Sequence, residues 1–534
     1  MKKLPVGIQT FSQLIDEGYI YVDKTEDIYN LITGGGKYYF LSRPRRFGKS
    51  LLISTLAELF SGNKELFKGL WIYEKIDWRE YPVLHIDFSK ISYKTPEILE
   101  ESLDAVVEKI ASDHGIQLNA KLFYKDKFGQ LIEKLAQKEK VAVLIDEYDK
   151  PIIDNIGKKD VASQNREILK EFYTVIKACD MFIKFAFITG VSKFSKVSVF
   201  SGLNNLYDIT IDSKYAVMLG YTQEELSTYF MPLIEKMVEQ EADASGAHKE
   251  SVKADLVRDI KRWYNGYSWD GEHFVYNPLS VLTFFSRGSF GNYWFETGTP
   301  SFLIKLMKEY KVDVTQLEHY KAGEAIFESF DVEKLHVVSL LFQTGYLTVK
   351  EVQPAGGRRV LYVLSYPNME VKESFLEHIL GEYSSQFADE VSVVIFELRD
   401  ALMANKMDAF FKRIQSIFAK ISYDMFVHER EGFYQTVIYL ILMLIGINVK
   451  TEIETNLGRI DAVVETGTHL YIMEFKVGTA VDALKQIDDK KYFQRYLDSS
   501  KEISLIGVGF DKELRNLKEY KIKTLSKKPN KPII

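Results

Sequence analysis

The sequence predicts a multidomain α/β protein, and three observations support this. The chain has 534 residues, which is too long for one hydrophobic core. Its N-terminal part contains short apolar runs separated by segments of helix length, as in a parallel sheet with crossover helices. Its C-terminal part contains two apolar runs that alternate at period two, as in a β-hairpin. We expect domains at residues 1–212, 213–300, 301–420 and 421–534.

Composition narrows the class of protein. Hydrophobic residues make up 46% of the chain and charged residues 27%, and the formal net charge is −6, so no overall basic field attracts nucleic acid. The single cysteine, Cys179, excludes a disulfide framework and a cysteine-based zinc site. The start of the chain lacks a signal-peptide core, and the apolar run from Val437 to Val449 is shorter than the roughly 20 residues of a membrane span. We expect a cytoplasmic protein with no membrane partner.

The first predicted domain is a parallel sheet. Four fully apolar runs are expected to be strands buried on both faces, and a fifth run is expected to close the domain. One strand lies in the chain between the two motifs described below, as expected when a strand is inserted between their two strands. The expected strands are residues 38–42, 83–88, 141–145, 182–188 and 206–211.

A candidate phosphate-binding loop follows the first strand. The segment RPRRFGKS leads into an apolar helix, and Gly48, Lys49 and Ser50 supply the close backbone approach, the cation and the magnesium-binding hydroxyl of a P-loop. Arg43 stands where the usual first glycine would be. The arginines of this loop either add contacts to phosphate or lie in solvent.

A candidate Walker B motif ends the third strand. Asp146 is placed to hold magnesium through water, and Glu147 to polarise an attacking water. The alternative is an exposed acidic turn. After the fourth strand, Thr189 or Ser192 is a candidate sensor of the γ-phosphate, although either hydroxyl could equally satisfy local backbone groups. In a ring-forming assembly, an arginine finger would be expected.

The middle of the chain is predicted to be largely helical. Thr222 and Glu225 form a candidate capping box that opens a helical lid extending to Tyr264, with a break near Ser245. The aromatic segment 264–278 is expected to form a small hairpin. A helix at 332–342 followed by strands at 346–352 and 359–365 predicts a winged-helix-like connector, and residues 370–419 are again helical.

The C-terminal hairpin gathers three polar groups. Residues 460–465 and 470–476 flank a short Thr-Gly-Thr turn, so opposite residues have numbers that add to 935. Asp461 then faces Glu474, and Lys476 lies on the same face. Two facing carboxylates repel unless a positive group lies between them, so we predict a divalent cation there. The alternative is a solvent-facing hairpin, but its flanking residues are very apolar.

The N-terminal part resembles a known family. The run GIQTFSQLIDEGYIYVDKTEDIYNLI, the loop LSRPRRFGKS and the strand end LIDEYDKPI are similar to the AAA-ATPase-like proteins over about residues 4–212. The resemblance implies nucleotide binding at Gly48, Lys49 and Ser50, with Asp146 and Glu147 as Walker B residues. It also implies that an arginine at the position of Arg43 is a family feature. The implied cofactors are ATP and Mg²⁺, the latter held by Ser50 and Asp146.

The C-terminal part resembles the PD-(D/E)xK nucleases over about residues 422–496. The resemblance implies that Asp461 and Glu474 hold Mg²⁺, with Mn²⁺ as an alternative, and that Lys476 orients or activates the attacking water. Glu431 is the implied further metal ligand, with Glu429 as its competitor. Gln486 and Lys490, four residues apart on one predicted helical face, match the auxiliary residues of many members.

These observations predict an ATP-binding and ATP-hydrolysing protein coupled to a metal-dependent nuclease. The alternative is a nucleotide-switched module that binds nucleic acid or a protein partner through a catalytically inactive nuclease fold. The expected partners are ATP and DNA or RNA. A homo-oligomer stays open, and the sequence does not choose between Arg166 and Arg262 as the arginine finger.

Overall fold

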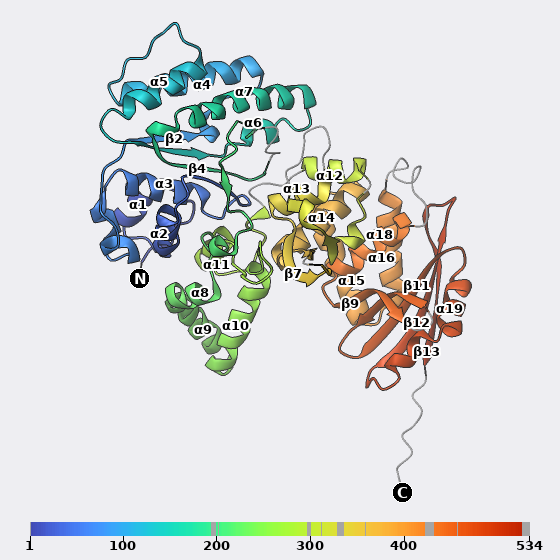
Figure 1. Cartoon of the computed structure of the whole chain (residues 1–534). Helices are drawn as coiled ribbons and strands as arrows, with labels where there is room; N and C mark the ends of the chain where they lie inside the picture. Colours follow the sequence, from blue (N-terminus) through green and yellow to red (C-terminus); the bar gives the residue numbers. More distant parts are fainter. Residues whose placement is uncertain are drawn as a thin grey trace. The chain divides into compact units, whose positions relative to one another are not determined.

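The computed structural model divides the chain into two compact units, which we describe separately. The first contains residues 1–312 and 316–372, and the second contains residues 313–315 and 373–534 (Figure 1). The finer division into four domains stays a prediction. The structure describes residues 2–193, 199–200, 202–295, 301–310, 312–327, 336–357, 359–421, 432–455 and 458–525.

A five-stranded parallel sheet forms the core of the first unit, as predicted. Its order is β2-β3-β4-β1-β5, and every neighbouring pair is parallel. The long apolar runs pack on both faces because crossover helices cover them. The strands are β1 (Tyr38–Ser42), β2 (Val83–Asp87), β3 (Val141–Asp146), β4 (Ile183–Gly190) and β5 (Tyr207–Asp208).

The sheet order corrects one expectation. The strand that lies between β1 and β3 in space is β4, whereas β2 forms an edge. At this edge His85 is exposed, so β2 is not buried on both faces as expected. Chain order between two motifs does not fix spatial order, because each crossover can return the chain to a different position in the sheet.

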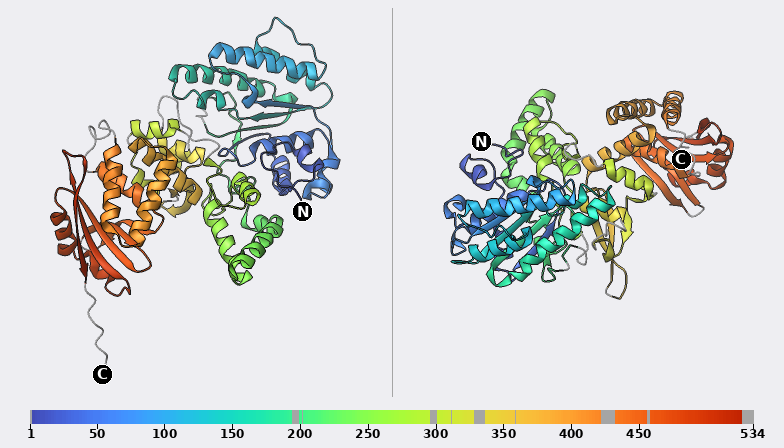
Figure 2. Two further views of the ribbon diagram at one scale, coloured as in Figure 1. Left: turned by 180° about the vertical axis from the view of Figure 1, so that it is seen from behind. Right: turned by 90° about the horizontal axis from the view of Figure 1, so that it is seen from above.

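Helices cover both faces of this sheet. Figure 1 shows α4, α5 and α7 on one side and α1, α2 and α3 on the other, and the view from behind in Figure 2 shows the same layers. The sheet is therefore sandwiched, and the residues of its three inner strands β1, β3 and β4 are almost all buried. The helices are α1 (Phe11–Asp16), α2 (Thr25–Thr33), α3 (Lys49–Phe60), α4 (Pro96–Asp113), α5 (Tyr124–Leu135), α6 (Lys150–Ile153) and α7 (Lys159–Ala178).

The predicted helical lid is confirmed. Thr222 and Glu225 make both hydrogen bonds of the capping box, and helices end at Ser245 and Tyr264 where the sequence indicated. The aromatic segment forms a narrow hairpin through an antiparallel bridge between Tyr267 and Val275. The helices are α8 (Gln223–Tyr229), α9 (Met231–Ser245), α10 (Lys249–Tyr264) and α11 (Pro278–Arg287).

The connector has the predicted helix followed by a hairpin. Helix α13 (Val337–Thr344) leads into β7 (Thr348–Pro354) and β8 (Val360–Ser365), which pair antiparallel. A short strand, β6 (Tyr320–Ala322), adds to β8, and α12 (Ser301–Glu309) precedes it. Gly345, at φ 92°, ends α13 in the left-handed conformation.

The second unit is a mixed sheet with helices on both faces. Its order is β13-β12-β11-β10-β9, with β11 and β12 parallel and the other pairs antiparallel. Helix α19 packs on β11 and β12, whereas α16 packs on β13 and α18 on β9 (Figure 1). The strands are β9 (Asn448–Thr455), β10 (Gly458–Glu465), β11 (His469–Val477), β12 (Glu502–Asp511) and β13 (Asn516–Leu525). The helices are α14 (Met369–Ser384, which starts in the first unit), α15 (Ala388–Met403), α16 (Met407–Lys420), α18 (Gly432–Leu444) and α19 (Ala480–Asp489).

The most apolar helix belongs to the core of the second unit. Val437, Leu440 and Ile441 of α18 are fully buried. In the part of the chain that the structure describes, no helix combines the length and the apolar character needed to cross a membrane.

Candidate functional site

The predicted phosphate-binding loop connects β1 to α3. Gly48 adopts φ 92°, a left-handed conformation that glycine takes without steric cost, and α3 begins at the next residue, Lys49. The N-terminus of α3, which has free backbone N–H groups and the positive end of the helix dipole, therefore lies directly after the loop. This arrangement is suited to an anionic ligand such as phosphate.

The structure brings Lys49, Ser50 and Asp146 together. Lys49 is 7% exposed, and its ammonium donates to the carbonyl oxygens of Arg43 and Pro44, both at 2.9 Å. Burial lowers the pKa of Lys49, and nearby carboxylates, Asp146 first, oppose this. Burial raises the pKa of Asp146, and a hydrogen bond from the Ser50 hydroxyl opposes that shift. The hydroxyl and carboxylate oxygens meet as a magnesium site would require.

Glu147 lies beside this pair and faces the pocket. Its backbone has φ 51°, which is uncommon for a residue with a side chain, and its N–H donates to the Asp146 carboxylate at 2.9 Å. The Glu147 carboxylate lies 3.4 Å from the Lys150 ammonium, and both residues line the cavity. An unusual backbone conformation at the end of β3 thus accompanies a carboxylate that lines the cavity over the loop.

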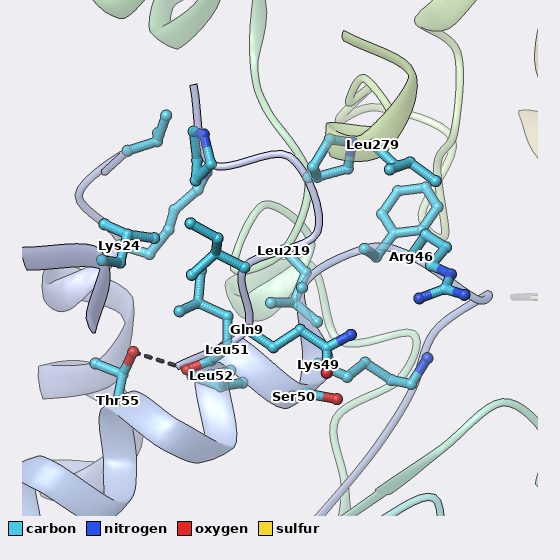
Figure 3. A pocket seen from close by; sticks show the side chains of 18 of the residues that line it. Gln9, Lys24, Arg46, Lys49, Ser50, Leu51, Leu52, Thr55, Leu219 and Leu279 are labelled. Carbon is cyan, nitrogen blue, oxygen red and sulfur yellow. Dashed lines mark hydrogen bonds between the residues drawn. The ribbon is translucent and has the colours of Figure 1, made fainter. Parts of the chain in front are cut away.

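A cavity of about 270 Å³ opens over the loop. Figure 3 shows Lys49 and Ser50 in its wall together with Gln9, Leu219 and Leu279. Cationic side chains and backbone of the loop form one part of the lining, and apolar side chains form another, which suits a ligand with an anionic end and a flat apolar end. The loop and the first turn of α3 contribute residues 45–52. Other lining residues include Ile8, Gln9, Ile20, Val22, Leu219 and Leu282.

Sequence reasoning missed part of this pocket. Residues 5–9 and 20–28 form one wall, and residues 218–221 and 278–282 form another. These segments lie far from the loop in sequence, so their spacing predicted no contact with it. The run beginning GIQTF carries a family resemblance, but nothing in its residue types or spacing indicates that Gly7, Ile8 and Gln9 line this cavity.

Arg43 is placed differently from either alternative considered. It is 1% exposed, so it does not lie in solvent, and it does not line the cavity. Its guanidinium donates to the carbonyl oxygens of Ser42 at 2.9 Å and Thr210 at 2.7 Å, and it stacks 3.7 Å from the ring centroid of Trp269. Burial lowers its pKa to about 9. The Arg43 guanidinium is therefore bound by protein groups. Arg45 and Arg46, which line the cavity, remain the candidates for phosphate contact.

The two candidate sensor hydroxyls bind protein groups. Thr189 donates to the carbonyl oxygen of Leu41 at 2.7 Å, and Ser192 donates to the Asp149 carboxylate at 2.6 Å. Asp149 also accepts the N–H of Ser192 at 2.6 Å. Both hydroxyls are fully buried outside the cavity lining, which favours the local structural alternative.

Neither candidate arginine finger lines the cavity. Arg166 bonds to Glu167 on its own helix, and Arg262 is exposed on α10.

In the second unit, the predicted hairpin register is confirmed. Ala462 pairs with Met473, and the following three pairs also have numbers adding to 935. Continuing this register by one residue places Asp461 opposite Glu474 on one face. The carboxylate of Asp461 accepts the backbone N–H of Phe475 at 2.8 Å, so it lies next to β11 at the level of Glu474.

Helix α19 completes this candidate site. Glu474 is 2% exposed, and its carboxylate accepts a hydrogen bond from the Gln486 amide. Lys476 is half-buried two residues further along β11, and Lys490 is exposed at the end of α19. The structure therefore brings Gln486 to the Glu474 carboxylate, whereas it shows no bond from Lys490 to Asp461 or Glu474 among the interactions described.

The donor set at this site fits a hard divalent cation. Asp461 and Glu474 supply carboxylate oxygens, which are the ligands preferred by Mg²⁺. Within the described ranges, no group of three or more His, Cys, Asp and Glu side chains is close enough to hold a metal. The predicted third ligand Glu431 and its competitor Glu429 lie outside the described residues.

Comparisons with known proteins agree with the two predicted domain types at the ends of the chain. Residues 5–200 match the family model described as Predicted AAA-ATPase, and residues 429–520 match the model of the PD-(D/E)XK nuclease superfamily. The chain is 40% identical over 535 residues to the "Uncharacterized protein in vnfD 5'region" of Azotobacter chroococcum mcd 1, covering 98% of this chain and 99% of that protein.

A solved structure, "Structure of Drosophila ORC bound to DNA", matches at 9% identity and a TM-score of 0.29, covering 86% of this chain and 90% of that chain. This likeness is too low to support an argument about fold or function. The full-length relative and the two family models do support one conclusion. The chain belongs to the same family as this relative and to the predicted AAA-ATPase family, with an AAA-ATPase-like domain at its N-terminus and a PD-(D/E)XK nuclease superfamily domain at its C-terminus.

Proposed function

We propose that this protein binds and hydrolyses ATP in its first unit and cleaves phosphodiester bonds, with a divalent metal, in its second. The observation that carries the ATPase half is the cavity over the N-terminus of α3, lined by Lys49, Ser50 and Glu147. The nuclease half is supported by the hairpin register, which pairs Asp461 with Glu474 when it is continued by one residue, and by Lys476 two residues further along β11.

In the ATP site, each protein group has a distinct role. The Lys49 ammonium would exchange its two carbonyl partners for phosphate oxygens, and the free N–H groups of α3 would bind the same anion. Glu147 would accept a proton from the water that attacks the terminal phosphorus. Mg²⁺, held by Ser50 and Asp146, would supply positive charge against the phosphates. The apolar walls from the N-terminal segment and from residues 218–221 would hold the base.

In the nuclease site, Asp461 and Glu474 would hold Mg²⁺ or Mn²⁺, which supplies Lewis-acid polarisation of the phosphate. Lys476 would orient the attacking water and neutralise developing charge on phosphate oxygens. Gln486 fixes the Glu474 carboxylate from the side of α19. The substrate is proposed to be DNA or RNA, because both share the phosphodiester that this chemistry addresses.

The ATPase proposal is tested with Lys49→Ala in the full-length chain. Removing a buried charge-assisted phosphate contact should weaken MgATP binding by about 10- to 100-fold. Lys37→Ala is the control, because Lys37 precedes β1 at the opposite end of the strand and pairs with Asp180. Calorimetric titration and phosphate release measure both variants. Equal MgATP affinity in Lys49→Ala and wild type would reject the assignment.

The nuclease proposal is tested with labelled single- and double-stranded DNA and RNA in Mg²⁺ or Mn²⁺. Asp461→Asn and Lys476→Ala should each abolish cleavage, whereas Lys521→Ala, an exposed change on edge strand β13, should not. Polynucleotides that stay whole with wild-type protein in every metal would rule out the cleavage activity.

That negative result would favour the second candidate, a nucleotide-switched binding module. The net charge of −6 provides no overall attraction for nucleic acid, so polynucleotide binding by this module would depend on local lysines and arginines. Binding of the same polynucleotides without cleavage, changed by MgATP, would identify it.

A further inference from the structure

The most unusual feature of the phosphate-binding loop is what holds it in place. In the usual pattern a glycine occupies the position of Arg43. Here the guanidinium at that position is 1% exposed and is bound by the carbonyl oxygens of Ser42, Thr210 and Tyr215, the last at 3.4 Å. A buried planar cation with several acceptors fixes its local backbone, because breaking any one bond leaves a desolvated group unpaired.

The aromatic hairpin of residues 264–278 also contacts the loop. Trp269 is 5% exposed, and its ring lies 3.7 Å from the Arg43 guanidinium. Phe47, on the other end of the loop, is 1% exposed and packs edge-on against Tyr267 at 4.7 Å and Trp269 at 5.6 Å between ring centroids. One hairpin thus contacts both ends of the loop.

Two more segments contact the residues between those ends. The indole N–H of Trp294 donates to the carbonyl oxygen of Arg45 at 2.7 Å. A side chain at Gly345 would meet Pro44 at 2.7 Å, so only glycine permits the observed approach. The contacts made by Tyr267, Trp269, Trp294 and Gly345 all come from residues C-terminal to the predicted ATPase domain.

The backbone that these contacts hold in place also binds Lys49. Lys49 donates to the carbonyl oxygens of Arg43 and Pro44. A shift of the Arg43 backbone would therefore move the carbonyl oxygens that bind the Lys49 ammonium. It would change the position of this ammonium in the nucleotide-free protein. Contacts around Trp269 can in this way influence nucleotide binding without touching the ligand.

We propose that Trp269 and Arg43 are positioning residues, which hold the phosphate-binding loop in the conformation that accepts nucleotide. We name Arg43, Phe47, Tyr267 and Trp269 the loop clamp. The inference rests on the proposed nucleotide-binding function, and it assigns a role to the aromatic segment 264–278 and to the arginine that replaces glycine. The clamp acts on Lys49 and the loop backbone, not on phosphate.

The test measures MgADP binding to the full-length chain by calorimetric titration. Trp269→Ala should weaken binding about tenfold, and Trp269→Phe, which keeps an aromatic face over Arg43, should stay within about threefold of wild type. Trp263→Ala is the matched control, because Trp263 stacks on Phe290 within the lid core and has no described contact with the loop. Trp263→Ala should bind MgADP like wild type, even if it lowers the unfolding temperature as much as Trp269→Ala does.

A second pair of variants keeps the test valid if Trp269→Ala does not fold. Arg43→Lys keeps the charge but loses the planar stack, and Arg43→Gly restores the usual loop residue. Both should weaken MgADP binding, and hydrogen exchange of the amides of residues 45–50 in the nucleotide-free protein should become faster. A purely structural role would lower the unfolding temperature without this local change.

The outcomes separate the clamp from the proposed function. Wild-type affinity for MgADP in Arg43→Lys, Arg43→Gly and Trp269→Ala would overturn the clamp and leave nucleotide binding intact. Equal loss of affinity in Trp263→Ala and Trp269→Ala would also overturn it. A wild-type chain that binds no adenine nucleotide would overturn the proposed function, and the clamp would fall with it.

Discussion

Single buried carboxylates set part of the pH response of the first unit. Asp27, in the first turn of α2, is mostly shielded from solvent, and this burial raises its pKa from 3.8 to about 6, with Lys24 opposing the shift. A folded-state pKa above the unfolded value means that the folded chain holds a proton that the unfolded chain has lost. Stability is therefore lost as pH rises from about 4 to about 6.

Asp27→Asn removes this ionisation. We expect the variant to exceed wild type in free energy of unfolding by on the order of 2–3 kcal/mol above pH 7, and the difference to vanish near pH 4. Urea unfolding of both proteins across this pH range measures it. Glu26→Gln, an exposed change in the same helical turn, is the control. A difference between Asp27→Asn and wild type that does not vary with pH would contradict the prediction.

The placement of a candidate site residue could be predicted from the sequence where its neighbours follow a local pattern. The order Gly48, Lys49, Ser50 after a strand requires a loop and a helix start, so their placement followed from the motif. The stack of Arg43 on Trp269 could not be predicted, because the two lie in different parts of the chain and no pattern links them. Thr189 and Ser192 were ambiguous for a related reason, since a hydroxyl at a strand end can bond to backbone or to ligand.

Among the elements, helix α8 shows how a local cap can stabilise the wall of a pocket. Thr222 accepts the N–H of Glu225 at 3.1 Å, and Glu225 accepts the N–H of Thr222 at 2.8 Å. Glu225 also pairs at 2.6 Å with Lys24, which lines the cavity. The cap therefore joins the start of the lid to the N-terminal wall.

Thr222→Ala should lower the free energy of unfolding by about 1 kcal/mol. The N–H of Glu225 then loses its acceptor, while Lys24 keeps its carboxylate partner. Ser227→Ala in the same helix is the control, because the Ser227 hydroxyl is exposed and bonds only to the carbonyl of Gln223 among the interactions described. Chemical denaturation measures both. A Thr222→Ala protein as stable as Ser227→Ala would show that the cap contributes nothing.

The elements also show which parts of the fold a sequence can predict. The β10–β11 register was predicted correctly because alternation and a short turn leave only one pairing that buries the apolar face. The position of β2 at the sheet edge was not predicted. Long crossovers join parallel strands, and no local sequence pattern determines which position in the sheet the next strand takes. Local pairing is thus readable, whereas the order of parallel strands depends on the whole core.

For the whole molecule, the central question is whether the two units act together. Each has its own sheet and core, so a change in one site should leave the folding of the other unit intact. Asp461→Asn should therefore retain wild-type ATP turnover. Coupling in the opposite direction requires that nucleotide binding change the nuclease, and this needs differential stabilisation of two states.

If ATP gates the nuclease, Lys49→Ala should cleave polynucleotide only at the nucleotide-free rate of wild type, and adding MgATP should not change that rate. Wild type and the control Lys37→Ala should both respond to MgATP, because Lys37 lies at the other end of β1 from the loop. Cleavage time courses with and without MgATP measure all three proteins. A Lys49→Ala variant that binds no nucleotide yet cleaves as fast as MgATP-bound wild type would show two independent modules, since the loss of phosphate binding at α3 would then have no consequence at β10 and β11.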